Sequence, residues 1–186
     1  MKCSVYIATS VDGFIAKPDG NVDWLHTAGN LNADMATEDM GFKSFMDSVD
    51  CMVMGRKCME MISNMDLTPE QWFYGDMKII VLSTTIKEAP EGLKGKVEMY
   101  SGGISELIGL LEKEGHTHCY VDGGTTIQSF INLKLINEII ITRAPILLGE
   151  GISLFGKIFK DIKLEKAEAT AFANDFVQVK YSVNYE

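Results

Sequence analysis

The segment Cys119–Ile131 reads Cys-Tyr-Val-Asp-Gly-Gly-Thr-Thr-Ile-Gln-Ser-Phe-Ile, and it predicts a buried strand, a sharp turn and a helix. Gly123 and Gly124 lack side chains, so the backbone can turn sharply there and a ligand can approach closely. Thr125 and Thr126 suit a helix start, and the apolar residues that follow have helical spacing. A helix N-terminus behind such a turn presents unpaired N–H groups to a phosphate. A turn that uses glycine only for its backbone angles fits these residues equally well.

The composition is that of one ordinary globular domain with an acidic surface. The chain has 186 residues, of which 46% are hydrophobic and 23% are charged, and its formal net charge is −9. We therefore expect a single domain over residues 1–186. The negative charge argues against nucleic acid or an anionic membrane as the main partner, because no basic block is present to release counterions.

The cysteines and the N-terminal residues favour a reduced, cytoplasmic protein. Three of the four cysteines lie inside apolar runs, and no Cys-x-x-Cys pair occurs. The N-terminus leads directly into a strand, and no apolar run approaches the length of a membrane span. His116, His118 and Cys119 are close in sequence, but they alternate along a strand and do not converge, so we expect no metal site.

The order of predicted elements indicates an α/β fold with a mostly parallel sheet. We expect strands at residues 3–9, 51–54, 78–82, 97–100, 118–121 and 137–142. We expect helices at residues 32–47, 58–62, 104–114 and 125–133. Strands that alternate with helices form a parallel sheet covered on both faces. Two further strands, 163–171 and 176–183, predict an antiparallel hairpin at the end of the chain.

Four predicted strand ends carry residues suited to phosphate binding. In parallel α/β sheets, ligands bind at the carboxyl ends of the strands. These ends supply glycine before a helix, two positive charges or three hydroxyl groups, at Gly102-Gly103, Gly123-Gly124-Thr125-Thr126, Gly55-Arg56-Lys57 and Ser83-Thr84-Thr85. Cations, hydroxyl groups and helix N-termini that converge would form a site for a phosphorylated nucleotide. The dinucleotide-binding pattern Gly-x-Gly-x-x-Gly does not occur, which argues against a standard Rossmann half.

Five segments, in order, resemble a known family. They are residues 7–16 (Ile-Ala-Thr-Ser-Val-Asp-Gly-Phe-Ile-Ala), 54–57 (Met-Gly-Arg-Lys), 80–83 (Ile-Val-Leu-Ser), 122–124 (Asp-Gly-Gly) and 144–151 (Ala-Pro-Ile-Leu-Leu-Gly-Glu-Gly). Together they resemble the dihydrofolate reductase-like superfamily. Within it, the chain is most similar to the C-terminal reductase domain of the bacterial bifunctional deaminase-reductase of riboflavin biosynthesis, as a stand-alone member. The resemblance implies a three-layer αβα fold.

The resemblance also implies NADPH as the cofactor. By position, Ala8 and Ile15 would meet the nicotinamide carboxamide through their backbones. The adenosine phosphates would be held by Gly55, Arg56, Lys57, Ser83, Thr84 and Thr85, and the pyrophosphate would face Gly123, Gly124, Thr125 and Thr126. The implied reaction is hydride transfer from NADPH to a C=N or C=O bond of a flat heterocycle, such as a pterin or a ribosylaminouracil phosphate-like pyrimidine.

A proton source is implied in the same way. Dihydrofolate reductases carry an acidic residue on the helix before the Gly-Arg motif, and by position this residue is Asp39. Thr142 matches the threonine that usually hydrogen-bonds the acid. Two environments are open for Asp39: an apolar cleft beside Phe42, where a raised pKa would suit a proton donor, and the solvent-exposed face of a helix, where most helix carboxylates lie. Asp12 and Trp24 are further candidates for the cleft.

The chain departs from the family pattern where the substrate would bind. No Arg or Lys occurs between Lys57 and Lys78, where dihydrofolate reductases place the arginine that binds the folate carboxylate, and Cys58 replaces the usual threonine. We therefore expect an uncharged or weakly charged heterocycle, which could stack on the aromatic cluster at residues 72–74. A nucleotide-binding protein without reductase chemistry and a flavin- or nitro-reductase are alternatives. The family habit and the C-terminal hairpin suggest a homodimer.

Overall fold

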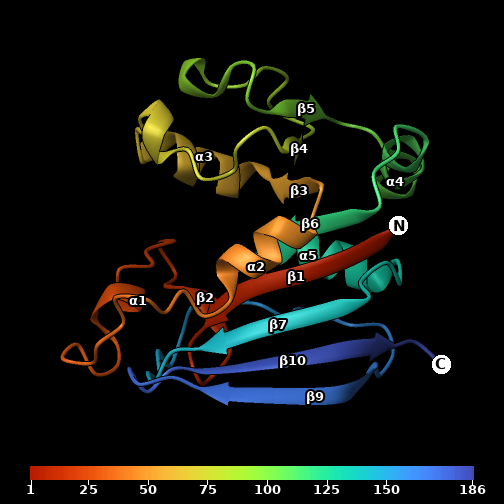
Figure 1. Cartoon of the computed structure of the whole chain (residues 1–186). Helices are drawn as coiled ribbons and strands as arrows, with labels where there is room; N and C mark the ends of the chain where they lie inside the picture. The colour runs from red at the N-terminus through yellow and green to blue at the C-terminus, as the bar shows by residue number, and fades with distance from the viewer.

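The strands of the protein form one large mixed sheet and a small second one (Figure 1). The computed structural model describes residues 1–186. In spatial order, the large sheet consists of β5 (Glu98–Tyr100), β4 (Lys78–Leu82), β3 (Cys51–Gly55), β6 (His118–Asp122), β1 (Lys2–Thr9), β7 (Glu138–Arg143), β10 (Val177–Asn184) and β9 (Lys163–Ala171). The small sheet pairs β2 (Phe14–Ala16) with β8 (Ile152–Ser153).

The strand directions confirm the predicted fold class. Every neighbouring pair from β5 to β7 is parallel. β10 runs antiparallel to both β7 and β9, and Figure 1 shows this hairpin at one edge of the sheet with β5 at the other. The parallel strands end at the same edge of the sheet, and this brings together the segments that follow β3 and β6.

Helices cover both faces of the parallel part of the sheet. They are α1 (Trp24–Thr27), α2 (Phe42–Ser48), α3 (Arg56–Asn64), α4 (Ile104–Lys113) and α5 (Gly124–Asn132), with 3-10 turns at Pro69–Gln71 and Glu91–Leu93. Buried side chains of α2 and α3 belong to one hydrophobic core, and those of α4 and α5 belong to another. This arrangement is the expected three-layer fold. None of the helices has the length and apolar character of a membrane span.

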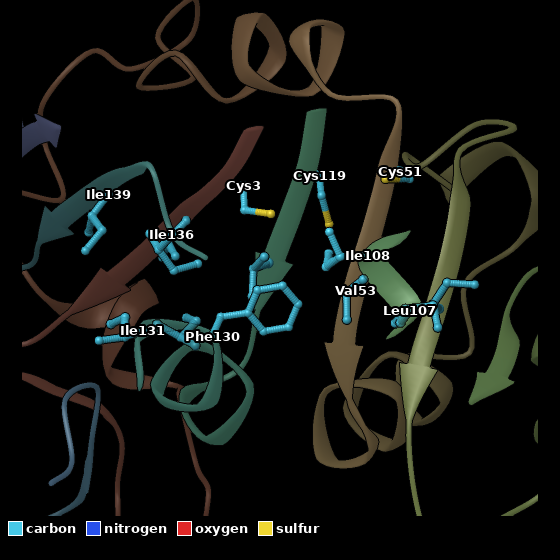
Figure 2. Close-up of a cluster of buried hydrophobic side chains, with 14 of the residues drawn as sticks. Cys3, Cys51, Val53, Leu107, Ile108, Cys119, Phe130, Ile131, Ile136 and Ile139 are labelled. Carbon is cyan, nitrogen blue, oxygen red and sulfur yellow. The ribbon is translucent and has the colours of Figure 1, made fainter. Parts of the chain in front are cut away.

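The central strands are buried on both faces because their side chains alternate between the two cores. In β3, Cys51 and Val53 pack with α4 and α5, whereas Met52 and Met54 pack with α2 and α3. This alternation explains the nearly continuous apolar runs of the parallel strands. Phe130 of α5 is fully buried, and Figure 2 shows its ring facing the sheet in the middle of its core.

The helix predicted at residues 32–47 is wrong over its first part, because α2 begins only at Phe42. Met40 and Gly41 have φ angles of 57° and 83°, which are left-handed conformations that an α-helix does not accommodate. Side chains in this segment also compete with helix formation by accepting hydrogen bonds from backbone N–H groups two residues further on, at Asn30, Asp34, Glu38 and Asp39.

Truncation of the largest buried side chain of α5 tests this description of the core. We expect Phe130→Ala to lower the free energy of unfolding by about 3–5 kcal/mol, because the loss of burial adds to the cavity left behind. Leu133→Ala is a matched control from the C-cap of α5, where the leucine is 47% exposed and a much smaller loss is expected. Urea denaturation of both variants gives the comparison, and equal losses would contradict the assigned core.

Candidate functional site

A cleft of about 770 Å³ opens at the carboxyl ends of β3 and β6. Its walls are β2 with the loop behind it, α3 from its start to Asn64, and the turn that leads into α5 with the first turns of that helix. Most of the residues predicted to bind the cofactor line this one cleft. They are Ile15, Gly55, Arg56, Lys57, Gly123, Gly124, Thr125 and Thr126. Segments more than 100 positions apart in the sequence therefore meet at one site.

Two helices begin at the cleft without a side-chain cap. The N-cap residues are Gly55 for α3 and Gly123 for α5, and neither helix start has a side-chain cap hydrogen bond. The first N–H groups of a helix have no intrahelical partner, and the helix dipole favours negative charge there. Arg56 and Lys57 add two positive side chains to the first turn of α3. The cleft is therefore built to receive an anion.

Glycine allows these two helix starts to pack directly on each other. A Cβ atom at Gly123 would lie 2.7 Å from the Sγ atom of Cys58, and one at Gly55 would lie 2.9 Å from the Oγ1 atom of Thr126. Gly123 also has a φ angle of 94°, which side-chain-bearing residues rarely adopt. A Cβ atom at Gly124 would lie 2.8 Å from the Cδ1 atom of Ile15. The exposed backbone, the two cations and the volume fit the phosphates of a dinucleotide.

Two predicted parts of the cofactor site do not reach the cleft. Of the end of β4, only Leu82 lines it. The hydroxyl of Ser83 instead accepts hydrogen bonds from the backbone N–H groups of Thr85 and Ile86, at 3.3 and 2.9 Å, and so holds its own turn. Ala8 is half-buried in β1 and does not line the cleft either.

Of the two environments open for Asp39, the structure shows the exposed one and not the apolar cleft. Its carboxylate is exposed and accepts hydrogen bonds from the backbone N–H groups of Gly41 and Lys43, at 2.9 and 2.8 Å, at the start of α2. These bonds stabilise the charged form, so the pKa of Asp39 is lowered, with Lys43 as the largest cause. Asp39 therefore stabilises the start of a helix and does not lie in an apolar cleft.

The threonine expected to bond Asp39 has another partner. The buried hydroxyl of Thr142 accepts a hydrogen bond from the side-chain amide of Gln178, at 2.9 Å. The same amide group lies 3.1 Å from the hydroxyl of Tyr6 and 3.0 Å from the carbonyl oxygen of Met40. The sequence analysis did not single out Gln178, which is paired with Thr142 across β10 and β7.

Asp12 connects two loops. Its carboxylate accepts hydrogen bonds from the Ser10 hydroxyl at 2.6 Å and from the backbone N–H groups of Gly149 and Leu148, at 2.8 and 3.2 Å. These bonds lower the pKa of Asp12, with Ser10 as the largest cause. Asp12 thus ties the loop after β1 to the loop after β7, and this is a structural role.

The two candidate substrate residues lie in different surroundings. Trp24 is only 3% exposed and packs with Ala144 and Phe176 in a small third core, so its ring is not on the cleft wall. Phe42 is half-buried, and its ring lies 5.5 Å from that of Tyr6 and 6.1 Å from that of Phe73. Phe73 is 53% exposed, which leaves part of this aromatic group open to a ligand.

Asp122 lies next to the cleft and was not among the predicted site residues, although it does not itself line the cleft. It is half-buried at the end of β6, directly before Gly123, and it is in register with Met54 of β3. Burial raises the pKa of Asp122. Hydrogen bonds from the Gly123 backbone N–H and the Cys58 thiol lower it, but by less. Burial and the nearby carboxylate also raise the pKa of Cys58. An acidic residue at the end of an otherwise apolar strand was the available signal.

Sheet order, helices on both faces and a nucleotide-sized cleft at the strand ends define a dihydrofolate reductase-like protein. The structure is similar to dihydrofolate reductase from Enterococcus faecalis complexed with NADP(H), with a TM-score of 0.63 and 16% identity over 98% of this chain and 95% of that one. It is also similar to the deaminase/reductase of Thermotoga maritima, with a TM-score of 0.66 and 15% identity over 97% of this chain and 56% of that one. At these identities the likeness concerns the fold.

The chain belongs to the RibD C-terminal domain family, which it matches over residues 2–178. A structure from Shewanella sp. PV-4 described as a "Putative riboflavin biosynthesis protein" is 38% identical, with a TM-score of 0.88 and 99% of each chain covered. The uncharacterized protein YwjB of Bacillus subtilis is 30% identical over 182 residues, or 97% of each chain. Riboflavin biosynthesis protein RibD of Corynebacterium ammoniagenes is 27% identical over 79% of this chain and 44% of its own length. The family supports a reductase-like role.

The opposite pKa shifts of Asp122 and Asp39 predict opposite effects of pH on stability. Folded Asp122 keeps its proton at pH values where the unfolded chain has lost it, so ionisation costs stability as pH rises above the ordinary value of 3.8. We expect Asp122→Asn to gain stability relative to the wild type across this window, by at most about 1.4 kcal/mol per pH unit.

Asp39→Asn is the matched control for this measurement. Its carboxylate has a lowered pKa, so its contribution to stability is fully present above the ordinary value of 3.8 and is lost as pH falls below that value. This variant should therefore differ from the wild type by a constant amount at neutral pH, and the difference should shrink as pH falls below 3.8. Urea denaturation of the three proteins between about pH 2 and pH 8 covers both windows. Parallel curves for the Asp122 variant and the wild type would show that burial does not perturb this carboxyl.

Proposed function

We propose that this protein is an NADPH-dependent reductase that transfers hydride to a C=N or C=O bond of a small heterocycle. The observation that carries the proposal is the cleft between α3 and α5, where two uncapped helix starts and two cations face one volume. Membership of the RibD C-terminal domain family supports the reductase class. Together they favour an enzyme over a nucleotide-binding protein without chemistry.

The residues of the cleft would bind and orient the cofactor. The backbone at Gly123 and Gly124 would receive the pyrophosphate, and Lys57 with Arg56 would balance phosphate charge at the start of α3. Ile15 of β2 packs against Gly124 and lines the cleft beside it, so β2 would contact the bound molecule next to the pyrophosphate. When bound, NADPH supplies the hydride, and the protein supplies orientation and a proton.

We propose Asp122 as the residue that holds this proton. A general acid must keep its proton at the working pH, and the raised pKa of Asp122 meets this condition better than the lowered pKa values of Asp39 and Asp12. Met54, its partner in register on β3, packs toward α2 and α3, and Asp122 shares that face of the sheet. Thr142 and Gln178 would add polar groups to the same face.

The substrate we propose is a flat, uncharged or weakly charged heterocycle. Phe42, Phe73 and Tyr6 form an aromatic group beside α2, on which such a ring would stack. The segment between Lys57 and Lys78, which contains Phe73, has no Arg or Lys to bind a carboxylate or phosphate, and Lys43 beside Phe42 is paired with Asp47. A flavin- or nitro-reductase would use the same aromatic surface. The expected homodimer and cytoplasmic location stay predictions.

Ligand-dependent stability tests the cofactor site. NADPH at about a hundred times its dissociation constant should raise the free energy of unfolding by about 2.7 kcal/mol, because it binds only the folded chain. Lys57→Ala should reduce this gain, and NADH and ATP at the same concentration are the reference ligands. Thermal or urea unfolding provides the measurement. No stabilisation by any of the three ligands would refute a nucleotide site in this cleft.

A comparison of substrates tests the proposed chemistry. We expect slow NADPH oxidation with dihydrofolate and with the ribosylaminouracil phosphate, since Lys43, the basic residue next to Phe42, is already paired with Asp47 at 2.9 Å. Uncharged pterins and pyrimidines should react faster, and flavins and nitroaromatics test the alternative reductase. The initial rate of NADPH absorbance loss is the readout. Efficient reduction of either charged substrate would contradict the substrate class, and no reduction of any compound would favour a binding protein.

A further inference from the structure

The cation best suited to a phosphate in this cleft is already paired with an acid. The Nη1 atom of Arg56 lies 2.6 Å from the Oε1 atom of Glu60, one turn further along α3. Both side chains are 40% exposed, and both residues line the cleft. The guanidinium of arginine binds phosphate through two parallel N–H groups, and a bound carboxylate competes for this geometry.

The acidic residues of the cleft match its basic residues in number. Arg56 and Lys57 are opposed by Glu60 and by Asp19, which lies on the loop behind β2. Pyrophosphate is common to NADPH and NADH, and the helix starts would receive it in either case. The two cofactors differ in a single 2′-phosphate on the adenosine ribose. A phosphate monoester carries a charge of about −1.5 to −2 at pH 7, so a nearby carboxylate acts on this group above all.

We propose that Glu60 is a specificity-determining residue that weakens the preference of this cleft for NADPH over NADH. The inference rests on the proposed function, because it concerns the same cofactor site. Glu60 pairs with Arg56, and its carboxylate repels a 2′-phosphate that approaches Arg56. Of the two cations at the start of α3, only Lys57 then has no acidic partner. An exposed ion pair breaks at little cost, so the repulsion by the remaining carboxylate is the larger effect.

The opposite role for Glu60 has a different experimental signature. A carboxylate can also hold an arginine in the orientation that a phosphate requires, and its loss then weakens phosphate binding. Neutralisation of Glu60 therefore separates the two roles by the sign of the change. Glu60→Gln keeps the size of the side chain and removes its charge. Asp19→Asn removes the same charge from the other side of the cleft, where the carboxylate bonds the backbone of Asn21 and not a cation.

Calorimetric titration of the wild type and both variants with NADPH and NADH tests the proposal. We expect Glu60→Gln to tighten NADPH about tenfold at low salt and to leave NADH within about twofold, because only NADPH carries the repelled phosphate. Adenosine 2′,5′-bisphosphate and AMP should show the same contrast without the nicotinamide. The gain should shrink as salt is raised, and Glu60→Gln should still give a gain in an Arg56→Gln background, because the carboxylate repels the phosphate with or without its arginine partner.

Three results would overturn the role of Glu60. Weaker NADPH binding by Glu60→Gln would mean that the carboxylate orients Arg56 for the phosphate. An equal change in the affinities for NADPH and NADH would mean that Glu60 does not discriminate between them. An equal gain in NADPH affinity in Asp19→Asn would mean that the effect comes from the overall charge of the cleft and not from Glu60. The proposed function fails separately, if the wild type binds neither dinucleotide. NADPH binding that Glu60→Gln does not tighten refutes only the inference.

Discussion

The close approach of two helix starts is the contact on which the rest of the site depends. α3 follows β3 and α5 follows β6, and these strands are neighbours in the sheet, about 4.8 Å apart. At this spacing, a side chain at Gly55 or Gly123 would collide with Thr126 or Cys58 of the opposite helix. Glycine therefore lets the helices meet, and it also leaves their first N–H groups accessible from one cleft. The packing of the helices and the proposed anion binding therefore depend on the same two residues.

Side chains along each central strand alternate between the two hydrophobic cores, and the residues proposed to bind phosphate or hold the proton lie where the strands end. In β6, Cys119 and Val121 pack with α4 and α5, whereas Tyr120 packs with α2 and α3. The last position of the strand lies beyond the core, so a polar residue is tolerated there, and Asp122 occupies it. The nucleotide cleft then lies at the strand ends, and the polar and aromatic groups proposed for the substrate gather on the face covered by α2 and α3. One parallel sheet thus brings both together without a second domain.

The sheet and the cleft could be predicted because they depend on local patterns, namely apolar runs and glycine where strands end. The predictions failed where the surroundings of a residue are set by distant partners. Trp24 is covered by Ala144 and Phe176, which come more than 100 residues later in the chain. Thr142 bonds Gln178 because β10 lies beside β7, and no local pattern indicates this register. The catalytic prediction for Asp39 has a local cause of error, since its carboxylate bonds its own backbone segment and does not line the cleft.

Cys58, where the chain departs from the family pattern, also affects the pKa of Asp122. A hydroxyl group donates a stronger hydrogen bond than a thiol, and a donated hydrogen bond stabilises a carboxylate in its charged form. Threonine at position 58 would therefore lower the pKa of Asp122 more than the thiol does. The thiol opposes the burial of Asp122 only weakly, and the thiol itself resists ionisation beside the carboxylate. The residue that weakens the resemblance thus favours a protonated carboxyl beside the cleft, which is the state that a proton donor requires.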